Sequence, residues 1–355
     1  MLSSIEQQQL SLKYDLNYVD ERGTSHFHLA CRYGFDDVVQ KFIELGQDPN
    51  CLEQPSTDSP LHLALKFGRK YSLELLLRNG ADPNAVDSKG LSALHLICQE
   101  LNFHNNEKDD GVGLFFGIIA ETGQGVQLNL RDKLGNTPLH YALHCNNTKA
   151  AQCLLSRRAD PNVANNEGST PLHVICQCYY DNTMSEEFFR ITQNRRQAQV
   201  NAQDKFGMTP LHWALRYREL HIICQKHQDN GLAEILFKFG NKRHQTIRVD
   251  VRDKKGRTPL QLAVANLLPK AVDQLLNHGA DDLSTFVFPS STLDPKDFSH
   301  SDVFKLTLAS RTMCVVQLLE EAGHELNITD ILTIMDSFAK YGNWMATQNS
   351  GETSH

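Results

Sequence analysis

The chain contains no long apolar run. No stretch approaches the roughly 18 consecutive apolar residues of a membrane-spanning helix, and residues 114–120 are typical of its longest patches. The first sixteen residues have neither the basic segment nor the apolar core of a secretory signal. We therefore expect no membrane span and no export by the secretory route.

Motifs of catalysis and metal binding are missing as well. The sequence holds no G-x-x-x-x-G-K-[ST] phosphate loop, no G-x-S-x-G and no G-x-G-x-x-G after a strand. It has no C-x-x-C pair, and His140 and His144, although spaced like zinc ligands, lack the glutamate of H-E-x-x-H. A zinc site that includes Cys145 and Cys178 remains as an alternative. We expect no enzyme activity, no cofactor and no metal.

Cysteine usage and charge indicate an intracellular protein. The nine cysteines are odd in number and scattered, which favours reduced thiols over a disulfide framework. The net charge of −7 gives no general attraction to nucleic acid or anionic membranes. Residues 238–257 carry eight basic and two acidic residues; a solvated edge is the simplest explanation, with an acidic partner or a nuclear signal as alternatives. We expect a monomer in the cytoplasm, with the nucleus as an additional location, that does not bind nucleic acid directly.

A short phrase ending in histidine recurs six times along the chain. It reads S-H-F-H, S-P-L-H, S-A-L-H and then T-P-L-H three times, and a seventh copy at residues 258–261 reads T-P-L-Q. The histidines are His28, His62, His95, His140, His173 and His212. A histidine present once per repeat is more easily explained as a structural part than as six active sites.

Each copy carries the signals of a turn followed by two helices. Asp eight positions and Gly five positions before the aligned residue, as in Asp132 and Gly135, form a D-x-x-G turn, because Asp binds backbone N–H groups and Gly takes a positive φ. Ser or Thr then caps a helix, and Pro suits its first position. A second amphipathic helix follows, and Gly46, Gly80 or Gly279 ends three of these.

A unit of about 33 residues with T-P-L-H-x-A is typical of ankyrin repeats, and the chain resembles the ankyrin-repeat family over residues 20–282. The resemblance implies an all-α ankyrin-repeat solenoid of stacked helix–turn–helix units with β-hairpin-like turn fingers. It implies that the repeated histidine binds the backbone of the neighbouring turn. It also implies that partners bind to the turn tips and to the concave face of the first helices.

The domain organisation follows from the repeats. We expect a partial N-terminal cap over residues 1–19, a linker over 283–301, a degenerate repeat or C-terminal helical cap over 302–342 and a disordered tail over 343–355. The seven repeats divide at about 20–52, 53–86, 87–131, 132–164, 165–203, 204–252 and 253–282. Within the degenerate unit, residues 303–311 and 315–323 keep the two-helix pattern. Inserted loops are expected at residues 102–113, 179–187, 221–230 and 241–248, as carriers of specificity or as tolerated slack.

Apolar residues at the turn tips are the candidate binding surface. Leu134 and Phe206 lie at tips, where interface anchors are often aromatic. The candidate patch across the fourth to sixth repeats consists of Lys133, Leu134, Lys205, Phe206, Met208, Arg216 and Tyr217. Five positions after the aligned residue, the first helices carry Tyr33, Phe67, Glu100, Cys145, Cys178 and Tyr217. Incidental surface apolarity is the alternative.

These patterns predict a non-catalytic scaffold or adaptor for an unidentified partner protein. One alternative is an IκB-like inhibitor of a transcription factor, although the long insertions and the lack of a D-S-G-x-x-S signal argue against it. The other is a substrate receptor that recruits a ubiquitin ligase through the segment after Val303.

Overall fold

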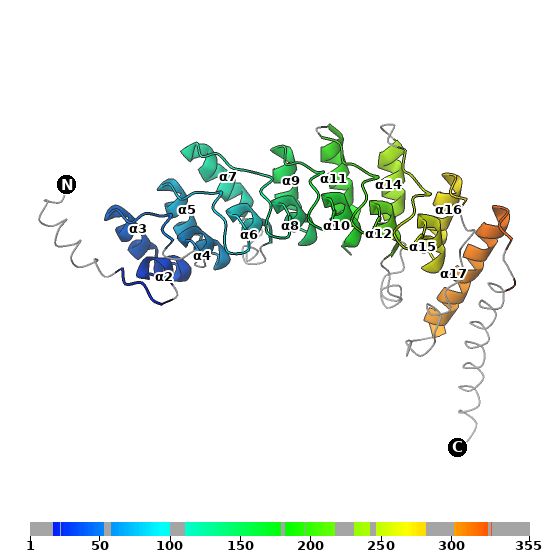
Figure 1. The fold of residues 1–355 in the computed structure, drawn as a ribbon, viewed down its shortest axis with the longest axis horizontal. Coiled ribbons are helices and arrows are strands. Elements are labelled where there is room, and N and C mark those ends of the chain that lie inside the picture. Colours follow the sequence, from blue (N-terminus) through cyan, green and yellow to red (C-terminus); the bar gives the residue numbers. More distant parts are fainter. Residues whose placement is uncertain are drawn as a thin grey trace, which may run out of the picture. The chain divides into compact units, whose positions relative to one another are not determined.

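The computed structural model shows an all-α chain. It describes residues 17–21, 23–52, 58–99, 111–178, 182–194, 196–216, 231–241, 246–281, 302–325 and 328. These residues form helices joined by turns, and their only extended pairing is two isolated bridges, Val19 with Ser25 and Val86 with Ser92 (Figure 1). The predicted fold class is confirmed. In the part described, no helix combines the length and apolar character needed to cross a membrane.

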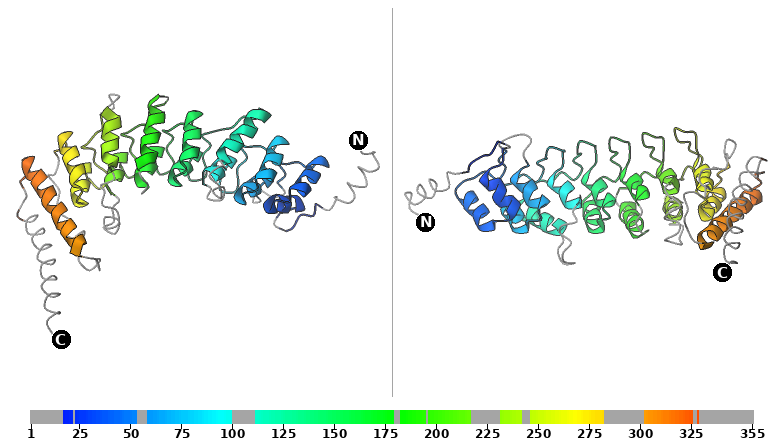
Figure 2. Two further views of the ribbon diagram at one scale, coloured as in Figure 1. Left: turned by 180° about the vertical axis from the view of Figure 1, so that it is seen from behind. Right: turned by 90° about the horizontal axis from the view of Figure 1, so that it is seen from below.

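The chain divides into two compact units, and each is described by itself. The first comprises residues 1–175 and 187–198, and the second comprises residues 176–186 and 199–355. In the first unit, α2, α4, α6 and α8 form one layer and α3, α5, α7 and α9 form the other (Figures 1 and 2).

The first helix of each repeat begins at the repeated phrase. These helices are α2 (His26–Tyr33), α4 (Pro60–Lys66), α6 (Ala93–Gln99), α8 (Pro138–His144), α10 (Pro171–Gln177), α12 (Pro210–Arg216) and α15 (Pro259–Ala265). The hydroxyl of Ser59 accepts a hydrogen bond from the backbone N–H of His62 at 3.3 Å, and Thr258 caps α15 in the same way. The predicted caps are therefore present in the structure.

The second helices are longer. They are α3 (Asp36–Glu44), α5 (Lys70–Arg78), α7 (Gly111–Thr122), α9 (Thr148–Ser156), α11 (Asn182–Asn194), α14 (Leu232–Asn241) and α16 (Pro269–Asn277). One more helix, α17 (Asp302–Glu321), follows the seventh repeat. Three expectations were wrong here. The two helices expected at residues 303–311 and 315–323 are one continuous helix, α17, because no Gly or Pro interrupts the sequence between residues 311 and 315. The insertion expected as a loop at 179–187 belongs from Asn182 onward to α11. The insertion expected as a loop at 102–113 belongs from Gly111 onward to α7.

The core lies between the two layers and is built from the repeated positions. The leucine of the repeated phrase is buried in every copy in which it occurs. Cys31 and Cys98 are also buried, in the slot that Leu65 and Leu143 fill in other repeats. Burial raises the pKa of both cysteine thiols, because it disfavours the thiolate. These cysteines therefore act as small apolar side chains.

Candidate functional site

An acidic or amide side chain closes five of the finger-like turns that the structure describes. Oδ1 of Asp132 accepts hydrogen bonds from the backbone N–H groups of Leu134 (2.9 Å) and Asn136 (2.7 Å). The same pair of bonds forms at Asp87, Asn165, Asp204 and Asp253. The prediction that the D-x-x-G segment forms a turn, in which the Asp side chain binds backbone N–H groups, is therefore confirmed.

The second carboxylate oxygen ties the finger to a helix. Oδ2 of Asp132 accepts a bond from the Tyr141 hydroxyl at 2.7 Å, and Oδ2 of Asp204 accepts one from Nε1 of Trp213 at 2.7 Å. Burial raises the pKa of Asp87, but bonds from the Leu91 N–H and from Lys66 outweigh this effect and lower the pKa overall. The fingers are therefore held rigidly on their helices.

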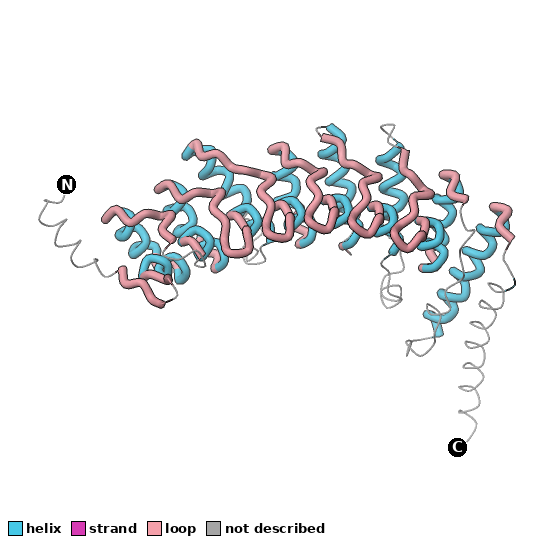
Figure 3. The backbone as a smooth tube through the Cα atoms, in the orientation of Figure 1, coloured by secondary structure: helices cyan, strands magenta, loops and turns pink. Residues whose placement is uncertain are grey.

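Neighbouring finger tips are joined through the backbone. In the first unit the N–H of Lys133 donates to the carbonyl of Lys89 (3.0 Å), and the N–H of Asn166 donates to that of Leu134 (2.9 Å). In the second unit Lys254 donates to Phe206 at 2.9 Å. Figure 3 shows the turns of the first unit as a row of loops beside the helices. The side chains at the tips remain available to solvent.

The repeated histidines link consecutive repeats. Nε2 of His62, His95 and His140 lies 2.8, 3.0 and 3.0 Å from the carbonyl oxygens of Leu91, Asn136 and Ser169. In the second unit, His212 makes the same contact with the carbonyl of Arg257 at 3.3 Å. Burial lowers the pKa of all four, to about 4 for His140, because it disfavours the charged ring. These four histidines have the structural role that the resemblance implied.

The predicted binding residues lie in two units. Lys133 and Leu134 are exposed at a tip of the first unit, with 66% of Leu134 accessible. Lys205 and Phe206 are exposed at a tip of the second, with 46% of Phe206 accessible. Tyr217 lies outside the described residues. That these residues form one contiguous partner-binding patch stays a prediction.

Met208 is not a surface residue, and its inclusion in the patch was wrong. Only 1% of it is exposed. Its backbone N–H is held by Oδ1 of Asp204, and its sulfur lies 3.3 Å from Nη1 of Arg216. The residue after the finger glycine therefore packs against Arg216, which is half-buried and lies 4.9 Å from the Trp213 ring.

An exposed aromatic cluster in the first unit, the Arg32 surface, is formed by Arg32, Tyr33, Phe35 and Phe67. The sequence analysis named Tyr33 and Phe67 as helix positions but did not predict that they gather around Arg32. The three aromatic residues are 53%, 58% and 41% exposed. The Arg32 guanidinium lies 4.6 Å from the Phe67 ring centroid and 5.8 Å from that of Tyr33, and the rings of Tyr33 and Phe35 stack at 6.0 Å. The sequence signal for this cluster is an aromatic residue five positions after the repeated histidine in two consecutive repeats.

The Arg32 surface is tied to the second repeat and keeps an available positive charge. Nε of Arg69, which precedes α5, donates to the carbonyl oxygen of Arg32 at 3.1 Å and so joins the first two repeats. Among the described residues the Arg32 guanidinium has no ion-pair partner. In the same part of the chain, no three His, Cys, Asp or Glu side chains gather as metal ligands would.

Comparison with known proteins identifies the family. A model of ankyrin repeats in three copies matches residues 4–87, 27–108, 61–165, 114–186 and 185–285. The chain belongs to the ankyrin-repeat family, and ankyrin repeats are modules of protein–protein interaction.

Parts of much longer proteins are similar to this chain. The transient receptor potential cation channel subfamily A member 1 homolog of Caenorhabditis elegans is 31% identical over 106 residues, 24% of this chain and 9% of that protein. Alpha-latrotoxin-Lhe1a of Latrodectus hesperus is 31% identical over 115 residues, 32% of this chain and 8% of that protein. The matched part of the chain thus spans less than a tenth of the length of these two relatives.

A solved structure supports the fold. The crystal structure of the ankyrin repeat domain of Bcl-3, a member of the IκB protein family, aligns with a TM-score of 0.54 and 23% identity. The alignment covers 72% of this chain and 100% of that one. At this identity the likeness concerns the fold alone.

Proposed function

We propose that this chain is a non-catalytic adaptor that binds a partner polypeptide through the Arg32 surface. The observation that carries the proposal is the cluster of exposed rings around a guanidinium that has no carboxylate partner among the described residues. Aromatic residues and arginine are enriched at the energetic centres of protein interfaces.

The chemistry of the surface defines the partner. The rings of Tyr33 and Phe67 offer apolar contact, and the Arg32 guanidinium offers a planar fork of N–H donors that suits a carboxylate. The fitting partner is a polypeptide segment with an Asp or Glu beside an apolar side chain. The exposed tips with Lys133 and Leu134 would extend the contact in the first unit. The IκB-like and ligase-receptor alternatives stay predictions, because no described residue favours either.

Affinity capture from extract of the source cells, followed by binding measurements with the purified partner, tests the proposal. Three chains are compared: the parent, Tyr33→Ser with Phe67→Ser, and the control Val86→Ser, which also removes an exposed apolar side chain in the first unit. We expect the double variant to bind the partner at least tenfold more weakly than the parent, with an unchanged melting temperature. The control should bind the partner as tightly as the parent does. If all three chains bind the partner equally well, the Arg32 surface is not the docking site.

A further inference from the structure

Two neighbouring finger-like turns of the second unit carry a concentration of positive charge. The turns at residues 203–208 and 252–257 contain five basic residues and two acidic ones. The corresponding turns of the first unit, at residues 86–91, 131–136 and 164–169, contain three of each. Because the whole chain has a net charge of −7, the positive charge is a local property of these two turns and does not reflect the overall composition.

The two acidic residues of these turns are buried and already bound. Asp204 is 6% exposed, and its carboxylate accepts hydrogen bonds from the backbone N–H of Phe206 and from Nε1 of Trp213. Asp253 is also 6% exposed, and its Oδ2 lies 2.7 Å from Nη2 of Arg257, so these two charges compensate each other. A partner that approaches the turns therefore meets their cations and not their carboxylates.

Four cations remain exposed at the turns, and they are Lys205, Arg252, Lys254 and Lys255. Lys254 and Lys255 have no ion-pair partner among the described residues. Arg248 and Asp250, which are exposed just before the second turn, add one charge of each sign and leave the balance unchanged.

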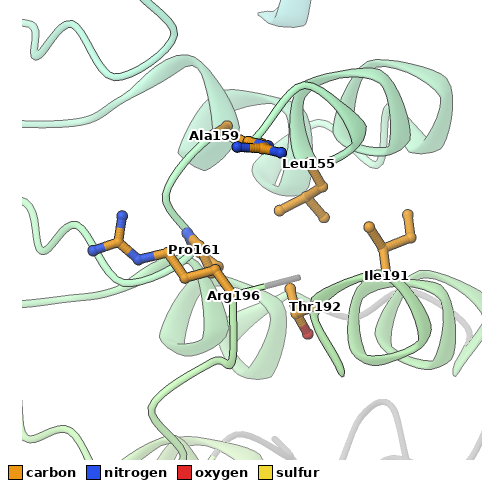
Figure 4. A pocket seen from close by; sticks show the side chains of 7 residues that line it. Leu155, Ala159, Pro161, Ile191, Thr192 and Arg196 are labelled. Atoms are coloured by element: carbon orange, nitrogen blue, oxygen red, sulfur yellow. The ribbon is translucent and has the colours of Figure 1, made fainter. Parts of the chain in front are cut away.

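An arginine of the first unit shows the contrast. Arg196 lines an open hollow beside α9 and α11 (Figure 4), and its Nη1 lies 2.9 Å from Oδ2 of Asp160. A guanidinium that is paired in this way attracts an acidic partner less strongly than an unpaired ammonium group does. The lysines at the second-unit turns have no such carboxylate beside them in the part of the chain that the structure describes.

Backbone contacts hold the two turns together as one surface. The N–H of Lys254 donates to the carbonyl of Phe206 at 2.9 Å, and a Cβ on Gly207 would lie 3.1 Å from the same nitrogen. Phe206 is 46% exposed, and its ring centroid lies 5.3 Å from Nζ of Lys205. We call this cationic surface with one exposed ring the Lys254 surface, and it consists of Lys205, Phe206, Arg252, Lys254 and Lys255.

We propose that the Lys254 surface binds an acidic segment of a partner polypeptide, in which Asp or Glu side chains flank an apolar one. The carboxylates pair with Lys254 and Lys255, and the apolar side chain covers the Phe206 ring. Complementary charge gives such a contact its specificity and its rate of association, and an aromatic residue is a frequent anchor. The inference goes beyond the proposed function, because no residue of the Lys254 surface belongs to the Arg32 surface.

A nucleic acid fits the Lys254 surface less well than an acidic polypeptide does. Binding to duplex DNA depends on many phosphate contacts along the backbone, and proteins that bind single strands stack successive bases on several aromatic side chains. The two turns contain a single aromatic residue, Phe206. The long-range charge of the chain, −7 overall, also opposes a polyphosphate.

Titration of the full chain into a labelled, capped nine-residue peptide, in which one leucine lies between two runs of four glutamates, tests the proposal by fluorescence anisotropy. We expect saturable binding, and binding at least about tenfold weaker when glutamine replaces every glutamate. No saturable binding, or equal binding of the glutamine peptide, would overturn the proposal. An oligothymidylate of the same net charge should bind more weakly than the glutamate peptide, and equal or tighter binding would assign the surface to nucleic acid instead.

Two variants locate the site. Lys254→Gln with Lys255→Gln should weaken binding of the glutamate peptide about tenfold, and Phe206→Ser should weaken it about fivefold. The matched control is Lys89→Gln with Lys133→Gln, which removes two exposed charges from first-unit tips that are joined by the same kind of bond, at 3.0 Å. All of these side chains are exposed, so the melting temperatures should not change. Equal weakening by the control would show that the Lys254 surface is not the binding site.

The chain with Tyr33→Ser and Phe67→Ser separates this site from the Arg32 surface. It should bind the glutamate peptide as tightly as the parent chain does, because its substitutions lie in the first unit. If it binds the peptide as weakly as the variant without Lys254 and Lys255, the Lys254 surface is not a separate site for acidic segments, while the proposed function of the Arg32 surface stands.

Discussion

Nε2 of His140 lies 3.0 Å from the carbonyl oxygen of Ser169, and Nδ1 of the same ring lies 2.8 Å from the hydroxyl of Thr137. Because Nε2 faces a carbonyl that can only accept, the proton resides on Nε2, and Nδ1 accepts from the hydroxyl and from the Thr137 N–H. One neutral ring therefore caps its own helix and binds the next repeat.

Acidification should destabilise the fold through these rings. Burial lowers the pKa of His140 from 6.5 to about 4, so between these pH values the unfolded chain binds a proton that the folded chain does not. The contribution is fully present above pH 6.5 and is lost as the pH falls to about 4, on the order of 3 kcal/mol for this ring. Urea unfolding at pH 7.5 and at pH about 4.5 measures the loss.

The control for this effect is His140→Gln, because Gln261 occupies the same position in the seventh repeat and forms the same cap with Thr258. Glutamine does not titrate, so the variant should lose less stability between the two pH values than the parent chain. An unchanged pH dependence would show that His140 is not responsible.

Close approach of neighbouring fingers should make one glycine less replaceable than another. Gly90 and Gly80 both have a positive φ, 81° and 92°, and both lie in the first unit. A Cβ on Gly90 would lie 2.9 Å from the backbone nitrogen of Lys133, whereas one on Gly80 meets nothing within 4 Å. Gly80→Ala should lower the free energy of unfolding by about 1 kcal/mol, from the left-handed backbone alone, and Gly90→Ala should lower it further. Equal losses in chemical denaturation would argue against tight finger packing.

Removing a leucine from the repeated phrase should open a cavity between the layers. Leu139 is fully buried, so Leu139→Ala should lower the free energy of unfolding by about 2–5 kcal/mol. Leu134→Ala removes the same atoms from an exposed tip and should change it by less than about 0.5 kcal/mol. Thermal unfolding of the two variants separates the positions, and similar melting temperatures would contradict the burial described.

Replacing Arg158 by glycine and replacing Arg157 by glycine should change the free energy of unfolding in opposite directions. Arg158→Gly relieves a left-handed backbone and should stabilise the chain by up to about 1 kcal/mol. Arg157 has a φ of −92°, so Arg157→Gly gains no such relief and should cost about 0.5–1 kcal/mol through backbone entropy. A stability loss in both variants, measured by urea unfolding, would mean that Arg158 is not strained.

The fold was predictable because its signals are local and recur. Asp132, Gly135 and His140 act within one turn, and a short repeated phrase contains all the information that such a turn needs. The continuity of α17 and the start of α11 were mispredicted because the repeated phrase is absent there, and no local motif marks where these helices begin or continue.

The surfaces were harder to predict, because exposure and juxtaposition arise from stacking. Met208 follows a finger glycine and was expected outside, yet the side chain of Arg216 packs against it. Arg32 and Phe67 are 35 positions apart in sequence and meet only because consecutive helices lie side by side.

The acceptor of each linking histidine is a peptide carbonyl, and the residues that supply it are Leu91, Asn136, Ser169 and Arg257. Their side chains have nothing in common, so the bond does not depend on which amino acid comes next. A coding segment that is duplicated or deleted by unequal recombination would restore the same junction with its new neighbour. Genes of this kind can therefore lengthen or shorten their products by whole modules during evolution.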